Sequence, residues 1–460
     1  MSKIYNLQNN LLQLEFSAPH HYPRQAYEHF LKSKLGQLFQ VIPWSELVVA
    51  VKKSRSETRG RKPVFDTRGK LALMILKSYL SVSDEQLMER LSSDFVVQFF
   101  CGVYFRPNDK IPHYKLISQI RVELGQWLDW DVFQKALARY WKPYLQDCEE
   151  CCLDATCYES DLRYPTDVKL LWECCEWLKK QIDLVCHHYH LAKPRNKFLE
   201  QRLKQLAYRR RKKPTHRQTQ ARIKTLLYLL DKLNTQVEPL MAQVPVKDLK
   251  LWARYFSRIH IVEKVYEQQL HKYQTGEHPK ERIVSLDKDY LRPIVRGKEN
   301  KRVEFGAKVH IIQVDGINFI EHFSYEAFHE GNRLLVAMDF HNQLMEVECQ
   351  RLAADTLYAT NDNRKECSKR KIATSFIPKG PLAKNEEERR KVRVELARKR
   401  ATRMEGSFGT EKRHYGLTRI RARTNLTEKL WIFFGVHTAN AIRMIPKMVE
   451  REPATLQQAA

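Results

Sequence analysis

Three acidic residues stand in sequence contexts that suit a metal-dependent reaction on phosphodiesters. Asp154 follows a short apolar approach of the kind that ends a buried strand, Asp355 ends a second strand-like stretch, and Glu405 lies in a helix-like stretch. Carboxylates from separate elements can hold two hard divalent cations roughly 3.5–4 Å apart, which activate a nucleophile and stabilise the leaving oxygen. A single Asp or Glu is more often a helix cap or a surface acid. Chemistry alone therefore does not select these three residues.

A lysine stands close in sequence to the third acid, Glu405. Lys412 follows Glu405 by seven residues, so the two side chains lie about two turns apart on one helix face. The whole chain is basic, since 80 Lys and Arg against 54 Asp and Glu give a net charge of +26. Such a surplus repels itself unless a polyanion offsets it, and nucleic acid is the commonest such partner. An anionic membrane fits less well, because the basic residues lie in several separated segments.

Two of these segments are candidates for contacts with DNA. The stretch from Lys52 to Pro63 holds Arg59, Arg61 and Lys62 around a glycine, a composition that suits a DNA minor groove and equally suits a solvated linker. Residues 193–224 carry thirteen Lys and Arg and one acid. A solvated helix face normally mixes charge signs, so we expect this second block to meet phosphates.

The elements that must position these residues fall into a helical part and a mixed part. The first ~140 residues have a helical period, with an apolar run at 69–80 and a capping box from Ser83 to Gln86 that opens the next helix. After Cys148 the pattern becomes strand-like. A break at 164–167 then caps a long helical region, 168 to about 272.

Strand signals return in the last third of the chain. A hairpin is expected where two alternating runs flank Asp315-Gly316. The other expected elements are strands at 283–286 and 345–355, a short helix at 332–337, a charged mobile stretch at 378–399 and a closing helix at 426–448.

The cysteines indicate a reducing compartment. Seven of the ten lie between Cys148 and Cys186, and several are adjacent, which suits free thiols better than a disulfide framework. A zinc site built from Cys148, Cys151, Cys157 and Cys186 with His187, His188 and His190 is a weaker alternative, because no second compact pair stands at a familiar distance. The first thirteen residues have no secretory pattern, and the apolar runs 71–80 and 430–436 are too short to span a bilayer.

Each of the three acids lies within a short sequence motif, and the motifs follow one another in a fixed order along the chain. Asp154-Ala-Thr with Tyr164-Pro-Thr-Asp167 resembles the first-Asp block of DDE transposases from bacterial insertion sequences, in the family numbered five. Ala354-Asp355-Thr-Leu-Tyr358 followed by Asn363-Arg364 resembles the second-Asp block. The third block is Glu405-Gly-Ser-Phe-Gly-Thr-Glu-Lys412 with Tyr415-Gly-Leu and Arg419-Ile-Arg-Ala-Arg423. Further similar stretches are Arg282-Ile-Val-Ser-Leu, Arg292-Pro-Ile-Val-Arg-Gly-Lys298 and Glu304-Phe-Gly-Ala-Lys308. The resemblance spans roughly residues 60 to 440, including the N-terminal helices.

The resemblance implies an α/β protein with an RNase H-like catalytic core. An all-helical DNA-binding domain (1–145) would precede the catalytic domain (146–445), which carries a basic helical insertion (about 165–280) and is followed by a tail (446–460). Asp154 and Asp355 would lie on adjacent central strands, with Glu405 reaching them from a helix, and together they would hold Mg²⁺, or Mn²⁺ as a substitute. Lys412 would join them in catalysis. The expected DNA contacts are Arg59, Arg61, Lys62, Arg292, Arg296, Lys298, Arg419 and Arg421.

The implied function is binding of terminal inverted repeats, followed by DNA strand cleavage and strand transfer. The expected partners are double-stranded repeat and target DNA and a second copy of the chain in the DNA complex, in the bacterial cytoplasm at the nucleoid and without a membrane. Two alternatives stay open: a nuclease of the same fold and an inactive transposase-derived DNA-binding protein. The chain also departs from the family where an arginine often precedes the Glu by four residues. That position is Ala401, with Arg400 and Arg403 beside it.

Overall fold

The computed structural model describes residues 5–6, 22–52, 63–105, 109–295, 303–380 and 385–458. Contacts divide the chain into two compact units. The first unit comprises residues 1–161, 307–324 and 328–460, and the second comprises 162–306 and 325–327.

The N-terminal part of the first unit is helical, as the sequence predicts. Helix α5 (Thr67–Leu80) is buried along nearly its whole length, which explains why its central run, residues 71–76, is apolar on every side. The capping box of Ser83 and Gln86 is present at the start of α6 (Asp84–Ser93). The other helices are α2 (Tyr22–Lys32), α3 (Lys34–Gln40), α4 (Trp44–Val49), α7 (Phe95–Cys101), α8 (Lys115–Trp127) and α9 (Trp130–Trp141). Short strands β1 (Tyr5–Asn6) and β2 (Val103–Tyr104) pair antiparallel.

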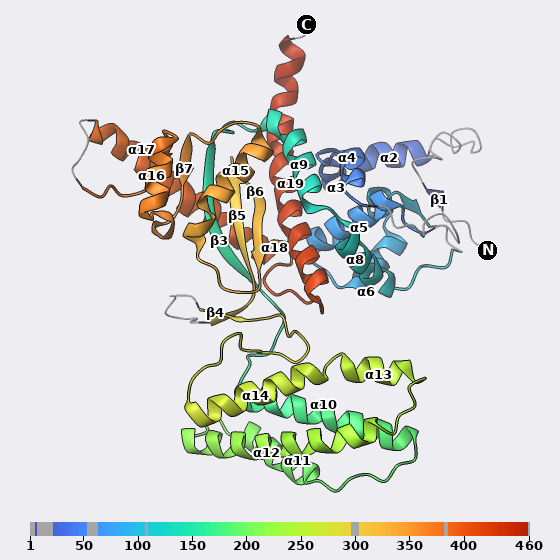
Figure 1. Ribbon diagram of the computed structural model, residues 1–460. Coiled ribbons are helices and arrows are strands. Elements are labelled where there is room, and N and C mark those ends of the chain that lie inside the picture. Colours follow the sequence, from blue (N-terminus) through green and yellow to red (C-terminus); the bar gives the residue numbers. More distant parts are fainter. Residues whose placement is uncertain are drawn as a thin grey trace. The chain divides into compact units, whose positions relative to one another are not determined.

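The first unit also contains a mixed sheet (Figure 1). Its strands are β3 (Glu150–Glu159), β5 (Val303–Val314), β6 (Ile317–Ser324), β7 (Arg351–Ala353) and β8 (Ala373–Thr374). The order runs β5-β3-β7-β8, and β6 pairs with β5. The β5–β6 hairpin turns at Asp315 and Gly316, both with positive φ, which confirms the hairpin prediction. Strands β3 and β7 are parallel neighbours.

Several predicted element boundaries were wrong. Strand β3 continues to Glu159, so Asp154 lies in the middle of a strand rather than at its end. Of the predicted strand 345–355 only β7 forms: Met345 ends helix α15 (Leu334–Met345), which is longer than the predicted helix 332–337, and residues 346–350 form no strand. Residues 283–286 form no strand. The stretch predicted to be mobile contains helix α17 (Glu386–Lys399), whose acidic first turn and basic last turn suit the helix dipole.

The closing helix joins the two parts of the first unit. Helix α19 (Asn425–Gln458) contacts α5 and α8 on one side and β6 on the other (Figure 1). Phe433 and Phe434 are fully buried on it and pack against Phe133 of α9. The remaining elements of this unit are helix α16 (Asn361–Lys369), helix α18 (Glu405–His414), the π-helix η5 (Arg400–Met404) and the short 3₁₀ segments η2 (Lys142–Tyr144), η3 (Glu330–Arg333) and η4 (Thr356–Tyr358).

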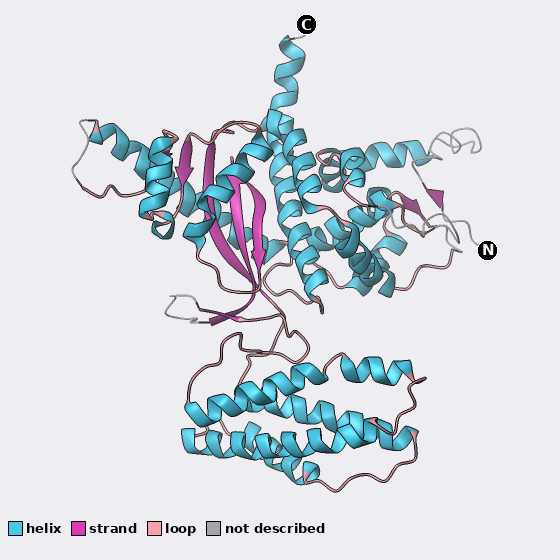
Figure 2. Cartoon of the chain, in the orientation of Figure 1, coloured by secondary structure: helices cyan, strands magenta, loops and turns pink. Residues whose placement is uncertain are grey.

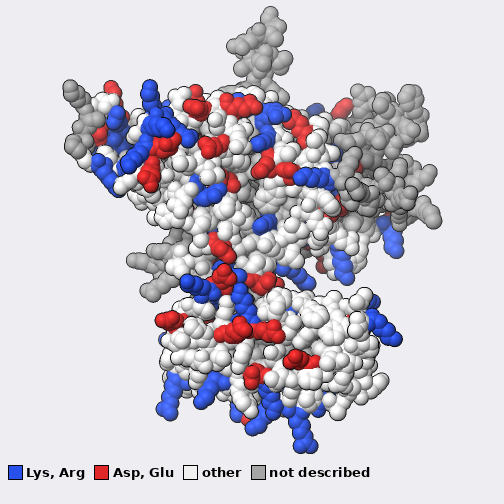
Figure 3. All heavy atoms as spheres, in the orientation of Figure 1, with Lys and Arg blue, Asp and Glu red and all other residues white. Residues whose placement is uncertain are grey.

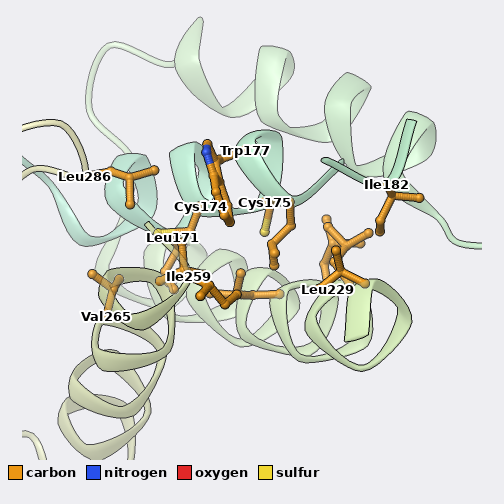
Figure 4. Packing of buried hydrophobic residues seen from close by; sticks show 14 of the residues in the cluster. Leu171, Cys174, Cys175, Trp177, Ile182, Leu229, Ile259, Val265 and Leu286 are labelled. Carbon is orange, nitrogen blue, oxygen red and sulfur yellow. The ribbon is translucent and has the colours of Figure 1, made fainter. Parts of the chain in front are cut away.

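The second unit is mainly a helical bundle (Figure 2). Its helices are α10 (Asp167–His188), α11 (Phe198–Arg209), α12 (His216–Met241), α13 (Leu249–Phe256) and α14 (Ile259–Thr275), which confirms the predicted long helical region. Leu171, Cys174 and Cys175 of α10 lie among the core side chains near Leu229 of α12 and Ile259 of α14 (Figure 4). Strand β4 (Pro293–Val295) pairs with the first residues of β5.

Candidate active site

Asp154 lies at the centre of β3 with its side chain 16% exposed. Its Oδ1 accepts a hydrogen bond from the Ala155 backbone N–H (2.8 Å), and its Oδ2 accepts one from Arg400 (2.8 Å). Burial raises the pKa of Asp154, and the nearby charges of Glu330 and Asp355 raise it further, while Arg400 opposes them. Several carboxylates are therefore close enough to repel one another.

Asp355 lies two residues beyond the last residue of β7 and caps the 3₁₀ segment η4. Its Oδ1 accepts from the backbone N–H and the hydroxyl of Thr356. Ser375 fixes the preceding residue, because its hydroxyl both accepts from Ala354 N–H (3.0 Å) and donates to Ala354 C=O (2.8 Å). The end of β7 therefore holds Asp355 in one backbone position.

The parallel register brings Asp154 and Asp355 to the same level. Cys152 of β3 is paired with Ala353 of β7. Two residues further along each chain stand Asp154 and Asp355. Neighbouring strands lie about 4.8 Å apart, so two acids at one register can face a shared cation.

Glu405 is joined to Asp154 through Arg400. The guanidinium of Arg400 lies 2.8 Å from Oδ2 of Asp154 and 3.6 Å from Oε1 of Glu405. Residues 400–404 form a π-helix, in which one turn takes an extra residue. Arg400, five residues before Glu405, therefore stands one turn away from it. Sequence spacing did not predict this contact, because Arg400 stands five residues before Glu405 and Ala401 stands four residues before it.

Lys412 projects from α18 toward the same strand. Its ammonium donates to the Thr156 hydroxyl (2.9 Å) and lies over the ring of Tyr158. Thr156 is two residues beyond Asp154, so the two side chains point to one face of β3. The predicted helix face that carries Glu405 and Lys412 thus meets the strand that carries Asp154.

A buried network fixes α18 against the sheet. Glu411 is fully buried and accepts hydrogen bonds from the Tyr158 hydroxyl and from the Asn318 amide, both at 2.5 Å. Arg443 of α19 lies 3.5 Å away. Burial raises the pKa of Glu411, which Arg443 and the two hydrogen bonds counteract. This anchor sets the position of Lys412, the next residue.

A further carboxylate near the two aspartates was not predicted from the sequence. Glu330, in η3, is 8% exposed and pairs with Lys308 of β5 (2.8 Å). No motif or period marks it in the sequence. Its neighbour in space, Tyr358, is buried and donates to or accepts from His310 Nε2 (2.7 Å), and burial together with surrounding carboxylates raises the pKa of Tyr358.

The donor set suits a hard divalent cation. Carboxylate oxygens are the ligands that Mg²⁺ and Mn²⁺ prefer. Asp154 and Asp355 are partly buried, Glu405 is exposed, and the Arg400 guanidinium lies between Asp154 and Glu405. Among the described residues, no three His, Cys, Asp or Glu side chains form a group that could hold a metal ion as they stand. A metal would therefore require Arg400 to move from Asp154 and Glu405.

The predicted DNA-binding residues have different placements. Arg59, Arg61, Lys62, Arg296 and Lys298 lie outside the described residues. Arg292 belongs to the second unit, where its guanidinium donates to the backbone oxygens of Asp289 and Leu291. The Arg292 side chain therefore forms hydrogen bonds within its own loop.

Arg419 and Arg421 are exposed in the first unit, on an extended segment that ends in a third exposed arginine, Arg423. The buried residues Ile420 and Ala422 alternate with them, and Ile420 is hydrogen-bonded to the end of β3. The three arginines therefore share one outward face, although Arg419 also lies 3.4 Å from Asp161.

The basic block of the second unit is mostly on its surface. Figure 3 shows basic side chains along the edge where α11 and α12 lie. Arg222 is the exception, because it is buried and donates to Gln201 and Gln205. The exposed residues are Lys193, Arg195, Lys197, Arg202, Lys204, Arg209, Arg210, Arg211, Lys212, Lys213, Arg217 and Lys224.

The cysteines are all free thiols. Cys151 and Cys157 of the suggested zinc cluster are buried, and the sulfur of Cys151 lies 3.4 Å from that of Cys349. Among the helices that the structure describes, none combines the length and apolar character that crossing a bilayer requires.

Two family models match the chain. One is described as a transposase domain (DUF772) and matches residues 24–123, which run from α2 into α8. The other is described as a transposase DDE domain and matches residues 352–437, which include Asp355, Glu405 and Lys412. The class defined by these matches is that of the DDE transposases. Together they support a DDE transposase of an insertion sequence. Comparisons with curated proteins and with solved structures gave no match.

Proposed function

We propose that the chain binds the terminal inverted repeats of an insertion sequence of family five and catalyses metal-dependent DNA cleavage and strand transfer. The observation that carries this proposal is the shared register of Asp154 and Asp355, with Arg400 connecting Asp154 to Glu405. The match of the DDE domain model over Asp355 and Glu405 supports it.

The proposed core is RNase H-like. The sheet order, with β6 beside β5, then β3, β7 and β8, supports this assignment, as does the helix α18 that carries the third acid. On this assignment the chain between β3 and β4 is the basic helical insertion (about 165–280) of a catalytic domain that spans 146–445. Residues 1–145 form the N-terminal DNA-binding domain, and 446–460 the tail.

Asp154, Asp355 and Glu405 are the proposed metal ligands. Bound Mg²⁺, or Mn²⁺, would supply activation of the attacking hydroxyl and stabilisation of the leaving oxygen. Arg400 holds Asp154 and Glu405 in place until then, and Lys412 stands beside Thr156, where its charge can hold a phosphate of the scissile strand. Water attacks first at the transposon end, and the freed 3′-hydroxyl then attacks target DNA.

The proposed partners are terminal-repeat and target DNA. The exposed arginines at 419 and 421 and the basic face of α11 and α12 support contacts with phosphates. Arg59, Arg61, Lys62, Arg292, Arg296 and Lys298 remain proposed contacts. A dimer on DNA follows from the need to bring two transposon ends together, and we propose the bacterial nucleoid as the site of action.

The experiment uses end-labelled DNA carrying the inverted repeats that bracket the gene. Asp355→Asn should abolish Mg²⁺-dependent cleavage and leave DNA binding at moderate salt intact, because it removes one ligand without removing any positive charge. Asp362→Asn is the matched control, since Asp362 is exposed on α16 close in sequence to Asp355. Cleavage that survives in Asp355→Asn would show that the assignment of the triad is wrong.

A further inference from the structure

Two buried thiols face each other where β3 and β7 begin. The sulfur of Cys151, in β3, lies 3.4 Å from the sulfur of Cys349, which stands two residues before β7. Cys151 is 1% exposed and Cys349 is 6% exposed. Both belong to the first unit, and the proposed reaction on DNA uses neither of them.

Backbone pairing holds the two sulfurs together. The N–H groups of Gln350 and Arg351 both donate to the carbonyl oxygen of Glu149, at 2.8 and 3.1 Å. The parallel pairing of the strands continues from there, with Glu150 opposite Arg351. A disulfide bond is about 2.05 Å long, so the sulfurs need to approach each other by about 1.4 Å. The sheet therefore places two thiols close to bonding distance.

Cys349 is the thiol that should react first. Hydrogen bonds from Cys151, through its thiol and its backbone N–H, lower the pKa of the Cys349 thiol against the effect of burial. The thiolate is the form of cysteine that reacts with oxidants. The residues on either side, Glu348 and Gln350, are exposed, so Cys349 lies just below the surface. In the core of the second unit, by contrast, burial raises the pKa of the Cys174 thiol and so keeps it protonated.

We propose that Cys151 and Cys349 form an oxidation site at which a hydroperoxide converts two thiols into one disulfide. The bond would join β3 to the segment that leads into β7. Asp154 follows Cys151 by three residues, and Asp355 follows Cys349 by six. The oxidation thus ties together the two segments that carry the aspartates.

The chemistry balances with hydrogen peroxide as the oxidant. The Cys349 thiolate attacks one peroxide oxygen, the O–O bond breaks, and the leaving hydroxide takes up the proton that the thiol had lost. The product is a sulfenic acid and one water. The Cys151 sulfur then attacks the Cys349 sulfur, the S–O bond breaks, and a second water leaves with the Cys151 proton. The two sulfurs lose two electrons in all, and these reduce the peroxide.

Peptide mapping of the unaltered chain after peroxide treatment tests the proposal. The folded chain should lose two of its ten free thiols and yield a peptide pair linked through Cys151 and Cys349, and dithiothreitol should restore both thiols. In urea this link should become a minor product, because 198 residues then separate the two cysteines along a flexible chain. Absence of the link in the folded chain would overturn the proposal, as would a link from Cys349 to Cys148 or Cys152 instead.

Two variants test the order of the steps. In Cys151→Ser, Cys349 should stop at the sulfenic acid, which dimedone labels. Cys174→Ser is the matched control, because it removes a buried thiol from the second unit and should leave the link between Cys151 and Cys349 intact. Dimedone labelling of Cys151 rather than Cys349 in the unaltered chain would contradict the assignment of Cys349 as the first thiol to react.

Thermal unfolding tests whether the strands accept the bond without distortion. A disulfide that closes so long a loop restricts the unfolded chain, so oxidation should raise the melting temperature by about 5 °C. Dithiothreitol should remove the increase, and Cys151→Ser should not show it. An unchanged or lower melting temperature in a chain that carries the linked peptides would mean that the bond distorts the sheet, and would overturn the claim that the fold is built to accept it.

Discussion

Asp154 of β3 and Asp355, which lies two residues past the end of β7, each follow by two residues the pair Cys152 and Ala353 that joins these parallel strands. Two hundred residues separate them in the chain, and the whole helical bundle of the second unit is inserted between them. Parallel pairing turns this distance in sequence into proximity in space, because equal register places both carboxylates at one level of the sheet. A helix that carries Glu405 and Lys412 then completes the group.

Arg400 competes with metal for the carboxylates it contacts. Arg400→Ala should tighten Mn²⁺ binding by about tenfold in the absence of DNA, equivalent to ~1.4 kcal/mol, slightly below the usual worth of a hydrogen bond to a charged group. Isothermal titration measures the change. Arg403→Ala is the matched control, because Arg403 lies near Asp315 instead. Weaker Mn²⁺ binding in Arg400→Ala would mean that the arginine supports the ligands rather than competing for them.

Lys412 should matter for chemistry more than for folding. Lys412→Met should lower single-turnover cleavage by about 10²-fold, the size expected on losing one charged donor to a developing anion. Arg413→Met removes an exposed charge from the same helix and should have little effect. The melting temperatures of the two variants provide the folding check. If Lys412→Met has a much lower melting temperature but its folded fraction cleaves DNA at the normal rate, Lys412 contributes to stability alone.

The exposed arginines 419, 421 and 423 should contribute to DNA binding through their charge. Replacing all three by Gln should flatten the slope of log K against log salt by about 0.9 for each phosphate that the protein no longer neutralises. Arg419 should contribute least, since Asp161 lies beside it. Replacement by Lys keeps the charge and should restore most of the slope. An unchanged slope in the Gln variant would place this face away from DNA.

His437 should make the fold sensitive to acid. Burial among Phe133, Phe319 and Phe433 lowers the pKa of His437 to about 3. The neutral ring is therefore favoured in the folded state, whereas the unfolded chain binds a proton below about pH 6.5. Stability from this group is complete above that pH and is lost as the pH falls toward 3, by about 1.4 kcal/mol per pH unit.

Denaturant unfolding of the chain and of His437→Leu at pH 7 and pH 5 measures this effect. The unaltered chain should lose about 2 kcal/mol more than the variant between the two pH values, which is about 1.36 kcal/mol per unit over roughly 1.5 units. Equal losses would show that folding does not change the pKa of His437.

Local patterns predicted the helices and the hairpin well, because caps, turns and apolar periods act over a few residues. Ser83 with Gln86 and the turn at Asp315-Gly316 are examples. The strands were harder to predict from the sequence. Strand β7 has only three residues, and its apolar approach from Met345 belongs partly to helix α15. Three residues are too few to show a period, so periodicity alone cannot separate a short buried strand from a helical segment.

The site itself was only partly visible in the sequence. Motif blocks pointed to Asp154, Asp355 and Glu405. The spacing of Arg400 from Glu405 did not, because in a regular α-helix a residue five positions before Glu405 lies on another face. The π-helix at 400–404 corrects the spacing, and no sequence rule signals such a bulge. Glu330 was invisible for a different reason. Its place beside η4 arises from the packing of η3 on η4, which is a tertiary contact.

Strand transfer tests the central claim most directly. A labelled, pre-cleaved transposon end with a free 3′-hydroxyl is incubated with the chain, Mg²⁺ and supercoiled plasmid. We predict covalent joining of the end to the plasmid by the unaltered chain and by Asp362→Asn, and no joining by Asp154→Asn, Asp355→Asn or Glu405→Gln. Metal-dependent cutting of DNA without any joined product would contradict the transposase and indicate a nuclease of the same fold.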